Sequence, residues 1–418
     1  MLLSLSIRNL FRHRWRFLIN ILVVMVASCL LVVALGQIGG INRTLTQSVT
    51  NTLTGHLVIK PESAPVDFFQ FTSSKKLPVI ATDDVGKVLS SIKSQPFVEA
   101  ASERVRFGSL IGDDNQSEPA MIIAVNPETE GLVCTDLTDI IAPLKNGENA
   151  AISSYLSKKT RLSKGESIVV FSETPNDSFN AAEYTLADIV NTPVLIDEFI
   201  NNVFFINIDT AHELLYLDGE ATEIVVRVKP EFQDKETIGA LAKQLNASLA
   251  NDFPELKAYA YFEVETSIEN ISVIAEGMGV IQVGTIILVM LVTVLILTSI
   301  TLHERRFEIG TLMSIGMTPG KLTTMFMLEV FLKVVIGYLV GFLLGVAILS
   351  GINLAGGIQA ANQVDQYIYG GKVMFPVINI SGSLLGGLLV IGVSMLVTWT
   401  TCHKAGRQNL VSLLSNKK

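Results

Sequence analysis

Three Gly-Lys pairs are the sequence's only approach to a phosphate-binding motif. They begin at Gly86, Gly320 and Gly371. A nucleotide-binding loop of the G-x-x-x-x-G-K-[ST] type also needs an upstream glycine and a hydroxyl residue after the lysine, and all three pairs lack both. We therefore expect no cofactor in this chain. ATP and Mg²⁺, if they are used, would be bound by a separate protein.

Catalytic and metal-binding patterns are also missing from the sequence. There is no G-x-S-x-G, H-E-x-x-H or C-x-x-C motif, and the 5 histidines are scattered along the chain. The 3 cysteines, Cys29, Cys134 and Cys402, have no metal-ligand spacing. The sequence thus predicts no catalytic residue, no metal site and no enzymatic activity.

A charged and amphipathic segment is the strongest functional signal in the sequence. A long apolar run stops at Glu304, Arg305 and Arg306, and a short helical pattern follows before Pro319-Gly320 breaks it. Its apolar face consists of Ile309, Leu312, Met313 and Met317. A short helix between two apolar runs is suited to contact a protein outside the lipid. We therefore interpret residues 303–322 as a coupling helix.

Ionisable residues also lie at the start of the apolar run that follows this segment. Glu329 and Lys333 are four residues apart, so they share a helix face and can pair. The pair either snorkels to the membrane surface or ties this helix to the coupling segment; the second reading is favoured.

Glycines recur with a spacing of four in the same run. Gly337, Gly341 and Gly345 form a repeated G-x-x-x-G stripe that lets a neighbouring helix approach closely. That neighbour is either another helix of the same chain or a second subunit, and the first is favoured.

Four apolar runs of membrane-spanning length position these residues. They cover about Phe17–Ile38, Met278–Leu302, Met325–Ser350 and Ser381–Cys402. The first run is longer than a signal-peptide core and has no small-residue cleavage site after it, which favours a retained anchor. The sequence predicts an α-helical membrane protein with four transmembrane helices and a large α/β extracytoplasmic domain inserted between helices 1 and 2.

Basic residues predict the orientation of these helices. They cluster in three short segments that contain few acids, and the positive-inside rule places such segments in the cytoplasm. Both termini and residues 303–322 are therefore expected inside, and the large domain outside. The net charge of −8 argues against nucleic-acid binding. The basic residues are Arg8, Arg12, Arg14, Arg16, Arg305, Arg306, Lys321, Lys404, Arg407, Lys417 and Lys418.

The predicted parts follow one another along the chain. Residues 1–16 form an amphipathic elbow helix on the inner membrane surface, with Arg8, Asn9, Arg12 and Arg16 on its polar side; a basic flank that only sets topology is the alternative. The further parts are transmembrane helix 1 with an outer stalk (17–54), the α/β domain (55–262), a stalk with helix 2 (263–302), the coupling helix (303–322), helix 3 (323–350), a short extracytoplasmic loop (351–380), helix 4 (381–402) and a cytoplasmic tail (403–418).

Two features of the outer domain leave alternatives open. Ile41, Leu45, Val49 and Leu53 repeat every four residues, which fits either a helical stalk or packing against the domain's own core, and the stalk is favoured. The phenylalanines at 68, 69 and 71 form either core or a loop that contacts substrate, and core is favoured.

The coupling segment resembles a known permease family. The pattern E-R-x-x-E-I-G-x-L-x-x-I-G, followed by Leu328-Glu329, is similar to the FtsX, MacB and LolC/LolE permeases. The residues before Arg16 also resemble the start of these proteins. The run from Ile208 to Val228 looks closest to the lipoprotein-releasing LolC/LolE type. The matching residues of the motif, expected to couple to the ATPase, are Glu304, Arg305, Arg306, Glu308, Ile309, Gly310, Leu312, Ile315 and Gly316.

The resemblance implies a permease subunit of a mechanotransmitting (type VII) ABC transporter in the bacterial inner membrane. Its implied partners are a separate ABC ATPase dimer, a second permease that is the same or related, membrane lipids, a lipoprotein or other amphiphilic substrate, and a periplasmic carrier. Extraction of lipoproteins for outer-membrane delivery is the favoured activity. MacB-like export of peptides or drugs, or FtsX-like signalling to a cell-wall hydrolase, are the alternatives.

Overall fold

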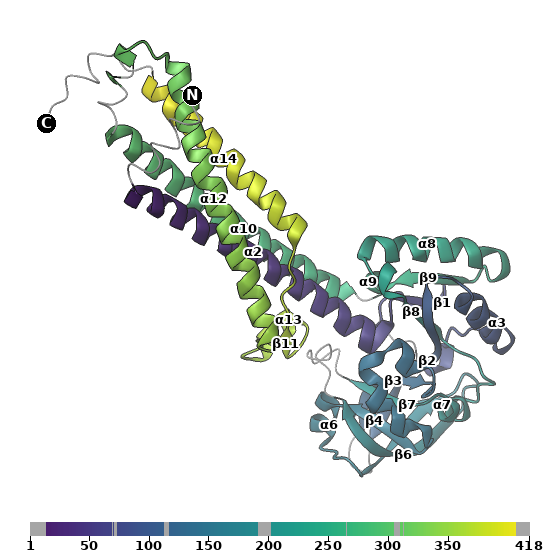
Figure 1. Ribbon diagram of the computed structural model, residues 1–418. Helices are drawn as coiled ribbons and strands as arrows, with labels where there is room; N and C mark the ends of the chain where they lie inside the picture. Colours follow the sequence, from purple (N-terminus) through teal and green to yellow (C-terminus); the bar gives the residue numbers. More distant parts are fainter. Residues whose placement is uncertain are drawn as a thin grey trace. The chain divides into compact units, whose positions relative to one another are not determined.

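The computed structural model describes residues 14–68, 70, 73–112, 117–190, 202–264, 266–304, 310–311 and 313–406. These residues form two compact units (Figure 1). The helical unit comprises the chain up to Asn42, Val273–Gln359 and the chain from Val373 onward. The α/β unit comprises Arg43–Ser272 and Ala360–Lys372.

Long apolar helices make up the helical unit. They are α2 (Arg14–Val49), α10 (Thr266–Glu304), α12 (Pro319–Leu354) and α14 (Ile380–Gly406), and α2 and α10 each reach into the α/β unit at one end. Among the described residues, four helical segments are long and apolar enough to cross a membrane, in agreement with the four predicted runs. They are Phe17–Thr54, Gly277–Thr301, Gly320–Leu354 and Ile380–His403.

The helical unit is apolar inside and outside, as a bilayer requires. All four helices contribute to its core, and large apolar side chains such as Leu288, Leu343 and Leu388 are exposed on its surface. The core side chains include Val24, Leu31, Met290, Val294, Val334 and Val390.

One half of the α/β unit is a split β-α-β sheet. Its strands lie in the order β9-β1-β8-β2, with antiparallel neighbours. Along the chain this half reads β1 (Leu57–Pro61), α3 (Thr82–Lys93), β2 (Val98–Gly112), β8 (Glu223–Val228), α8 (Lys235–Asp252) and β9 (Leu256–Ala260). This is a ferredoxin-like arrangement, interrupted between β2 and β8.

Amphipathic helices cover one face of this sheet. Val88 of α3 and Leu245 of α8 belong to one core with Ile59 and Val226 of the strands. The Asp234 carboxylate accepts a bond from the Thr237 N–H, which caps the start of α8. In both helices the buried residues recur at helical spacings of three and four positions.

The insertion after β2 closes into a barrel with the outer part of β2. Its strands are β3 (Ser117–Val125), β4 (Asn149–Ser153), β5 (Ser167–Glu173), β6 (Phe179–Val190) and β7 (Val203–Asn207). The ring runs β2-β3-β7-β4-β6-β5 and returns to β2, where Leu110 pairs with Phe171. Phe107, Ile122 and Phe204 lie among the buried side chains of this core. Strand β2 is thus shared by both halves.

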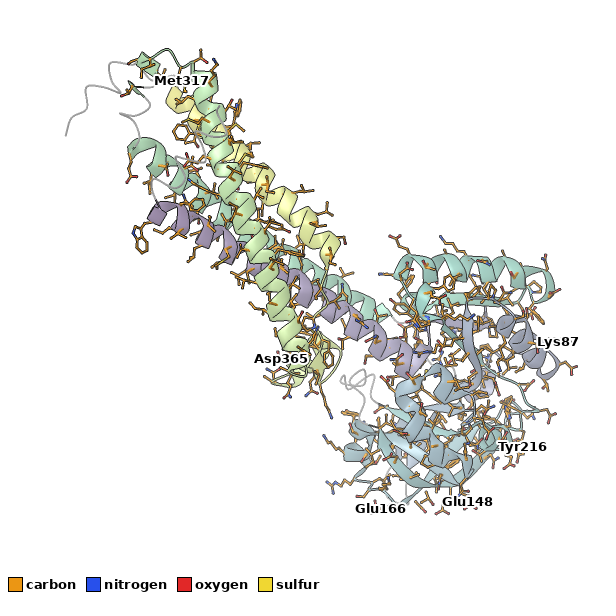
Figure 2. All side chains as sticks on the ribbon, viewed as in Figure 1. Lys87, Glu148, Glu166, Tyr216, Met317 and Asp365 are labelled. Carbon is orange, nitrogen blue, oxygen red and sulfur yellow. The ribbon has the colours of Figure 1, made fainter. Side chains whose placement is uncertain are left out.

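Short elements complete the fold. They are the π-helical turn η1 (Thr50–Thr54), the 3₁₀ turns η2 (Ser74–Lys76), η3 (Thr135–Leu137), η4 (Ala142–Lys145) and η6 (Pro230–Phe232), the helices α4 (Glu130–Val133), α5 (Thr138–Ile141), α6 (Ser154–Thr160), α7 (Ile208–Leu215), α9 (Tyr261–Val264) and α13 (Gln363–Tyr369), and the strands β10 (Ile358–Gln359) and β11 (Val373–Met374). Tyr216 follows α7 in a left-handed conformation and is exposed (Figure 2).

The apolar stripe after the first span packs into the α/β unit. Leu45, Val49 and Leu53 are almost completely buried, and Val49 and Leu53 belong to cores formed with the unit's strands. Leu45, Val49 and Leu53 thus pack against the domain's own core, and the favoured reading of this stripe as a stalk is wrong for these residues. The unit accordingly starts at Arg43, before the boundary expected at residue 55.

Part of the connection between α12 and α14 also belongs to the α/β unit. Residues Ala360–Lys372, from the loop expected at 351–380, include α13. Gly370 has φ +68°, and a Cβ there would lie 2.8 Å from the Leu45 Cα, so only glycine fits. Phe68 is fully buried, which agrees with the core reading for that residue; Phe69 and Phe71 lie outside the described residues.

Candidate functional site

The described part of the coupling segment is a short helical piece that ends at Gly316. Gly310, Thr311, Met313 and Ser314 are helical, and the Ile315 N–H donates to the Thr311 carbonyl at 3.1 Å. Gly316 has φ +97°, a conformation that glycine adopts without strain. The glycine therefore ends the helix before α12 begins at Pro319.

Two methionines anchor this piece to the bundle. Met313 and Met317 are partly buried against a core formed by Leu322, Met325, Phe326 and Cys402 of α12 and α14. Met317 lies at the end of the bundle where α12 starts (Figure 2). Ile315, between the two methionines, is 80% exposed. The segment thus presents an apolar residue outward from a fixed base.

The structure places the other predicted coupling and elbow residues as follows. Glu304 is exposed at the end of α10, Gly310 is buried, and Arg16 lies in the first turns of α2. The predictions on Arg305, Arg306, Glu308, Ile309, Leu312, Arg8, Asn9 and Arg12 lie outside the described residues.

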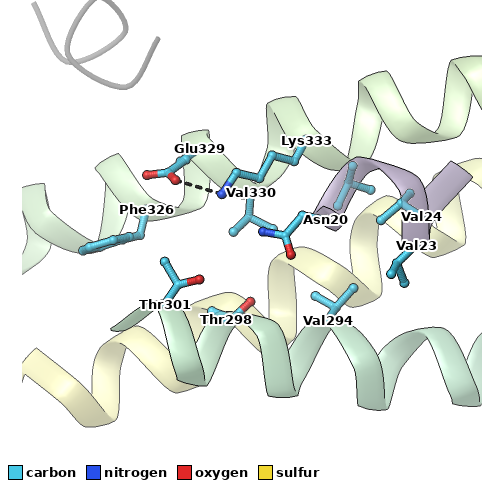
Figure 3. A pocket seen from close by; sticks show the side chains of 11 residues that line it. Asn20, Val23, Val24, Val294, Thr298, Thr301, Phe326, Glu329, Val330 and Lys333 are labelled. Carbon is cyan, nitrogen blue, oxygen red and sulfur yellow. Dashed lines mark hydrogen bonds and ion pairs between the residues drawn. The ribbon is translucent and has the colours of Figure 1, made fainter. Parts of the chain in front are cut away.

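Glu329 and Lys333 form the ion pair that their spacing suggests. The Lys333 Nζ donates to the Glu329 Oε1 at 2.8 Å, and the side chains are 9% and 2% exposed respectively (Figure 3). Both side chains face the interior of the helical unit. A buried charge in an apolar bundle is costly unless it is paired, and this pairing removes most of that cost.

A small cavity of about 40 Å³ lies beside this ion pair. Polar side chains reach it from three helices, namely Asn20 of α2, Thr298 and Thr301 of α10, and the pair itself on α12 (Figure 3). The remaining lining is apolar, with Val24, Val294 and Phe326 among it. A space of this size with several polar partners suits a few water molecules rather than a substrate.

The glycine stripe of α12 packs against α2 of the same chain. A Cβ on Gly337 would lie 2.8 Å from the Val24 Cβ, and one on Gly345 would lie 2.8 Å from the Val32 Cβ. A Cβ on Gly341 would overlap the Met25 carbonyl oxygen. In this structure the stripe therefore serves packing within the chain, so that α2 and α12 approach backbone to backbone.

The α/β unit contains a buried charge cluster that the sequence did not predict. Arg104 of β2 is fully buried and pairs with Glu130 of α4, to which its Nε donates at 2.9 Å. Its Nη1 lies 3.8 Å from Glu223 of β8, and Arg106 donates to the same Glu223 at 3.1 Å. Lys60 lies nearby and donates to the Pro65 carbonyl at 2.6 Å.

Burial and neighbouring charge compete in this cluster. Burial alone would lower the pKa of Arg104, but Glu130 outweighs it and holds that pKa above the ordinary range. Burial would raise the pKa of Glu223, and Arg106, Arg104 and Lys60 outweigh it, so that pKa is lowered. Burial lowers the pKa of Lys60 to about 8. Arg104 and Glu223 therefore stay charged at neutral pH.

The residues of this cluster are too far apart in the sequence for a short motif to predict it. Arg104 and Glu130 lie on separate elements, and Glu223 comes from the strand that follows the whole barrel insertion. In a strand, the alternation in Glu103-Arg104-Val105-Arg106 would suggest that the two arginines lie on an exposed face. Here, Arg104 and Arg106 are buried at the junction of the two halves.

Comparisons with known proteins match separate parts of the chain. Residues 280–405 match the family model described as FtsX-like permease C-terminal. No curated protein matches the chain in a sequence comparison. The periplasmic region of MacB from Actinobacillus actinomycetemcomitans is 10% identical with a TM-score of 0.33, and covers 53% of this chain and 94% of its own. The extracellular domain of the noncanonic ABC-type transporter YknZ from Gram-positive bacteria is 10% identical with a TM-score of 0.31, and covers 49% and 98%.

Proposed function

We propose that this chain is the permease subunit of an ABC transporter whose ATPase is a separate polypeptide. The observation that carries the proposal is the FtsX-like permease match over residues 280–405, which includes the segment where Ile315 is 80% exposed between two anchored methionines. An exposed isoleucine on a fixed helical end is suited to fill a groove on a partner. ATP and Mg²⁺ would bind to that partner.

In this proposal the coupling segment lies on the cytoplasmic side of the inner membrane. The basic residues around it and at both ends of the chain support that orientation by the positive-inside rule. The α/β unit would then be periplasmic. A push on the segment at Ile315 would reach α12 through Met313 and Met317, and α2 through the close glycine contact with α12.

The substrate that we favour is a lipid-modified protein lifted from the outer leaflet. A mechanism of this kind needs no wide pore through the membrane. A second permease, the same or related, would face the first across the substrate. Export of peptides or drugs and signalling to a cell-wall hydrolase are the competing activities.

Ile315→Asp tests the coupling role. The full chain would be purified from its native membrane with its ATP-hydrolysing partner, and ATP hydrolysis by the complex would be measured. We expect the variant to lose partner capture and the stimulated hydrolysis, because a carboxylate cannot fill an apolar groove.

Val364→Asp is the matched control, since Val364 is a 65% exposed apolar residue on α13. Equal capture and hydrolysis in wild type and Ile315→Asp would refute the coupling role. Failure of the wild type to associate with any ATPase would refute the proposed function itself. A co-purified lipoprotein supports extraction, and a peptidoglycan hydrolase would favour signalling.

A further inference from the structure

The last turn of the first long helix ends inside the α/β unit. It is the π-helical turn η1, and the terminal carbonyl groups of a helix need donors from outside it. Gly55 follows with φ +63°, and a Cβ there would lie 2.8 Å from the Val226 carbonyl oxygen. The chain therefore leaves the helix in direct contact with strand β8 and enters β1.

Two arginines from adjacent strands hold this turn. Arg104 of β2 donates through Nη1 to the Leu53 carbonyl. Arg227 of β8 donates through Nη1 to the Asn51 Oδ1 at 3.1 Å. Positive side chains at a helix C-terminus are also favourable electrostatically.

The same two arginines hold helix α4, which directly follows strand β3 of the barrel. Arg104 pairs with Glu130 at the start of α4, and Arg227 donates to the Val133 carbonyl at its end, at 3.0 Å. The Arg104 side chain is 0% exposed and that of Arg227 is 17% exposed. Each arginine thus bridges η1 and α4 from the shared sheet.

We propose that Arg104 and Arg227 form a joint that passes displacement of helix α2 into both halves of the α/β unit. Strands β2 and β8 belong to the split β-α-β half, and α4 leads into the barrel half. The inference rests on the proposed function, since α2 is a lever only if an ATPase drives it. A π-helical turn is a weak point of a helix, and without its clamps it would unwind and absorb the displacement.

Only an arginine suits the buried position of the joint. The guanidinium of Arg104 reaches Glu130 with Nε and Nη2 while Nη1 bonds Leu53. A lysine keeps the positive charge but has a single side-chain nitrogen. Arg104→Lys therefore keeps the charge and removes the simultaneous bonds to Glu130 and to the Leu53 carbonyl.

Arg106 supplies a matched control on the same strand. It is also buried, and it pairs with Glu223 at 3.1 Å. Its Nη1 donates to the carbonyls of Phe68 and Gln70, which lie in the loop after β1 rather than in η1 or α4. A purely structural role for buried arginines predicts equal behaviour of Arg104→Lys and Arg106→Lys.

The first test needs no ATPase. Hydrogen–deuterium exchange of the full chain in detergent is compared for wild type, Arg104→Lys, Arg227→Lys and Arg106→Lys. In Arg104→Lys and Arg227→Lys we expect the amides of residues 50–54 and 130–134 to exchange about tenfold faster or more. The exchange rates of the β9 amides should not change. Wild-type exchange in both variants, or the same pattern in Arg106→Lys, would overturn the joint.

The second test uses the complex with its ATPase. We expect ATP to change exchange in β3 and β7 in wild type and Arg106→Lys, but not in Arg104→Lys or Arg227→Lys, while ATP hydrolysis persists in all four. A full ATP response in Arg104→Lys and Arg227→Lys would also overturn the joint. If the wild type neither binds nor stimulates an ATPase, the proposed function fails and the joint fails with it, whereas the first test still shows whether Arg104 and Arg227 hold η1 and α4 together. Arg227→Lys serves if Arg104→Lys fails to fold, because Arg227 is partly exposed.

Discussion

Two of the buried ion pairs among the described residues differ in how they are built. Glu329 and Lys333 lie on one helix, four residues apart, with a cavity beside them. Arg104 and Glu130 lie on a strand and a short helix, fully buried, and Arg104 also bonds the Leu53 carbonyl. The first pair forms wherever its helix forms, whereas the second exists only when three separate segments have assembled.

The two units also differ in what brings their elements together. In the α/β unit, arginine side chains fill the junction and bond several partners at once. In the helical unit, glycines remove side chains so that α12 contacts α2 directly. Lipid tails offer no hydrogen bonds, and they are as apolar as the side chains, so burying an apolar side chain between membrane helices gains little free energy. Close backbone packing therefore replaces the hydrophobic effect in the helical unit. We expect losses of charge to cost most in the α/β unit, and gains of volume to cost most in the bundle.

The largest expected effect is that of Arg104→Met. The variant leaves Glu130 buried without the arginine that pairs with it and removes one of the two arginines beside Glu223, which costs about 3–5 kcal/mol of unfolding free energy. The loss is measured by denaturant unfolding of the full chain, followed by far-UV circular dichroism. The double variant Arg104→Met/Glu130→Leu should recover part of it. Additive losses in the cycle would mean that the two residues are not coupled.

Acidification should weaken the α/β unit through His56. Burial, aided by the positive charge of Arg227, lowers the pKa of His56 from 6.5 to about 4. Its Nδ1 accepts a bond from the Val228 N–H at 3.4 Å, and the ring is buried.

Below about pH 6.5 the His56 ring therefore binds a proton in the unfolded state, whereas in the folded state it binds that proton only below about pH 4. The stability contribution of the neutral ring is complete above pH 6.5 and falls by up to about 3 kcal/mol as the pH drops through that window. Unfolding free energies of wild type and His56→Gln between these pH values test this. Parallel pH profiles for the two proteins would contradict it.

A branched side chain at Gly341 should separate α12 from α2. A Cβ there would overlap the Met25 carbonyl and lie 2.8 Å from the Ser28 Cβ, so Gly341→Val costs about 1–3 kcal/mol by overpacking. Gly284→Val is the control, because no atom lies within 4 Å of a Cβ built on Gly284. Unfolding of the bundle in mixed micelles provides the measurement. Equal stability of the two variants would show that the glycine stripe does not set the helix spacing.

The smallest effect is expected for the pair on α12. Lys333→Met with Glu329→Gln removes both charges, and the change in bundle stability should be near 1 kcal/mol, since polar contacts between or along membrane helices are individually weak. Each single variant should cost more than the double, because it leaves one buried charge. If the coupling energy of Glu329 and Lys333 equals that of Arg104 and Glu130, the expectation that lost charges cost most in the α/β unit is wrong.

Elements with strong local periodicity could be predicted from the sequence. The four apolar helices and the helices α3 and α8 follow from runs and repeats that are visible in a short window. The Glu329–Lys333 contact follows from helix geometry alone. The sequence left the partner of the glycine stripe open, and it left the stripe Leu45–Leu53 open as well, because periodicity shows a buried face without showing what covers it.

By itself, the sequence determined that this chain has long apolar helices, a separate α/β region and no nucleotide-binding loop. Only the tertiary structure decided that β2 runs through both halves of the α/β unit and that Arg104 joins Leu53, Glu130 and Glu223. The physical reason is the range of the interactions. Hydropathy and helix spacing act between neighbours in the chain, while a buried charge is satisfied by whichever distant groups the fold brings within bonding distance.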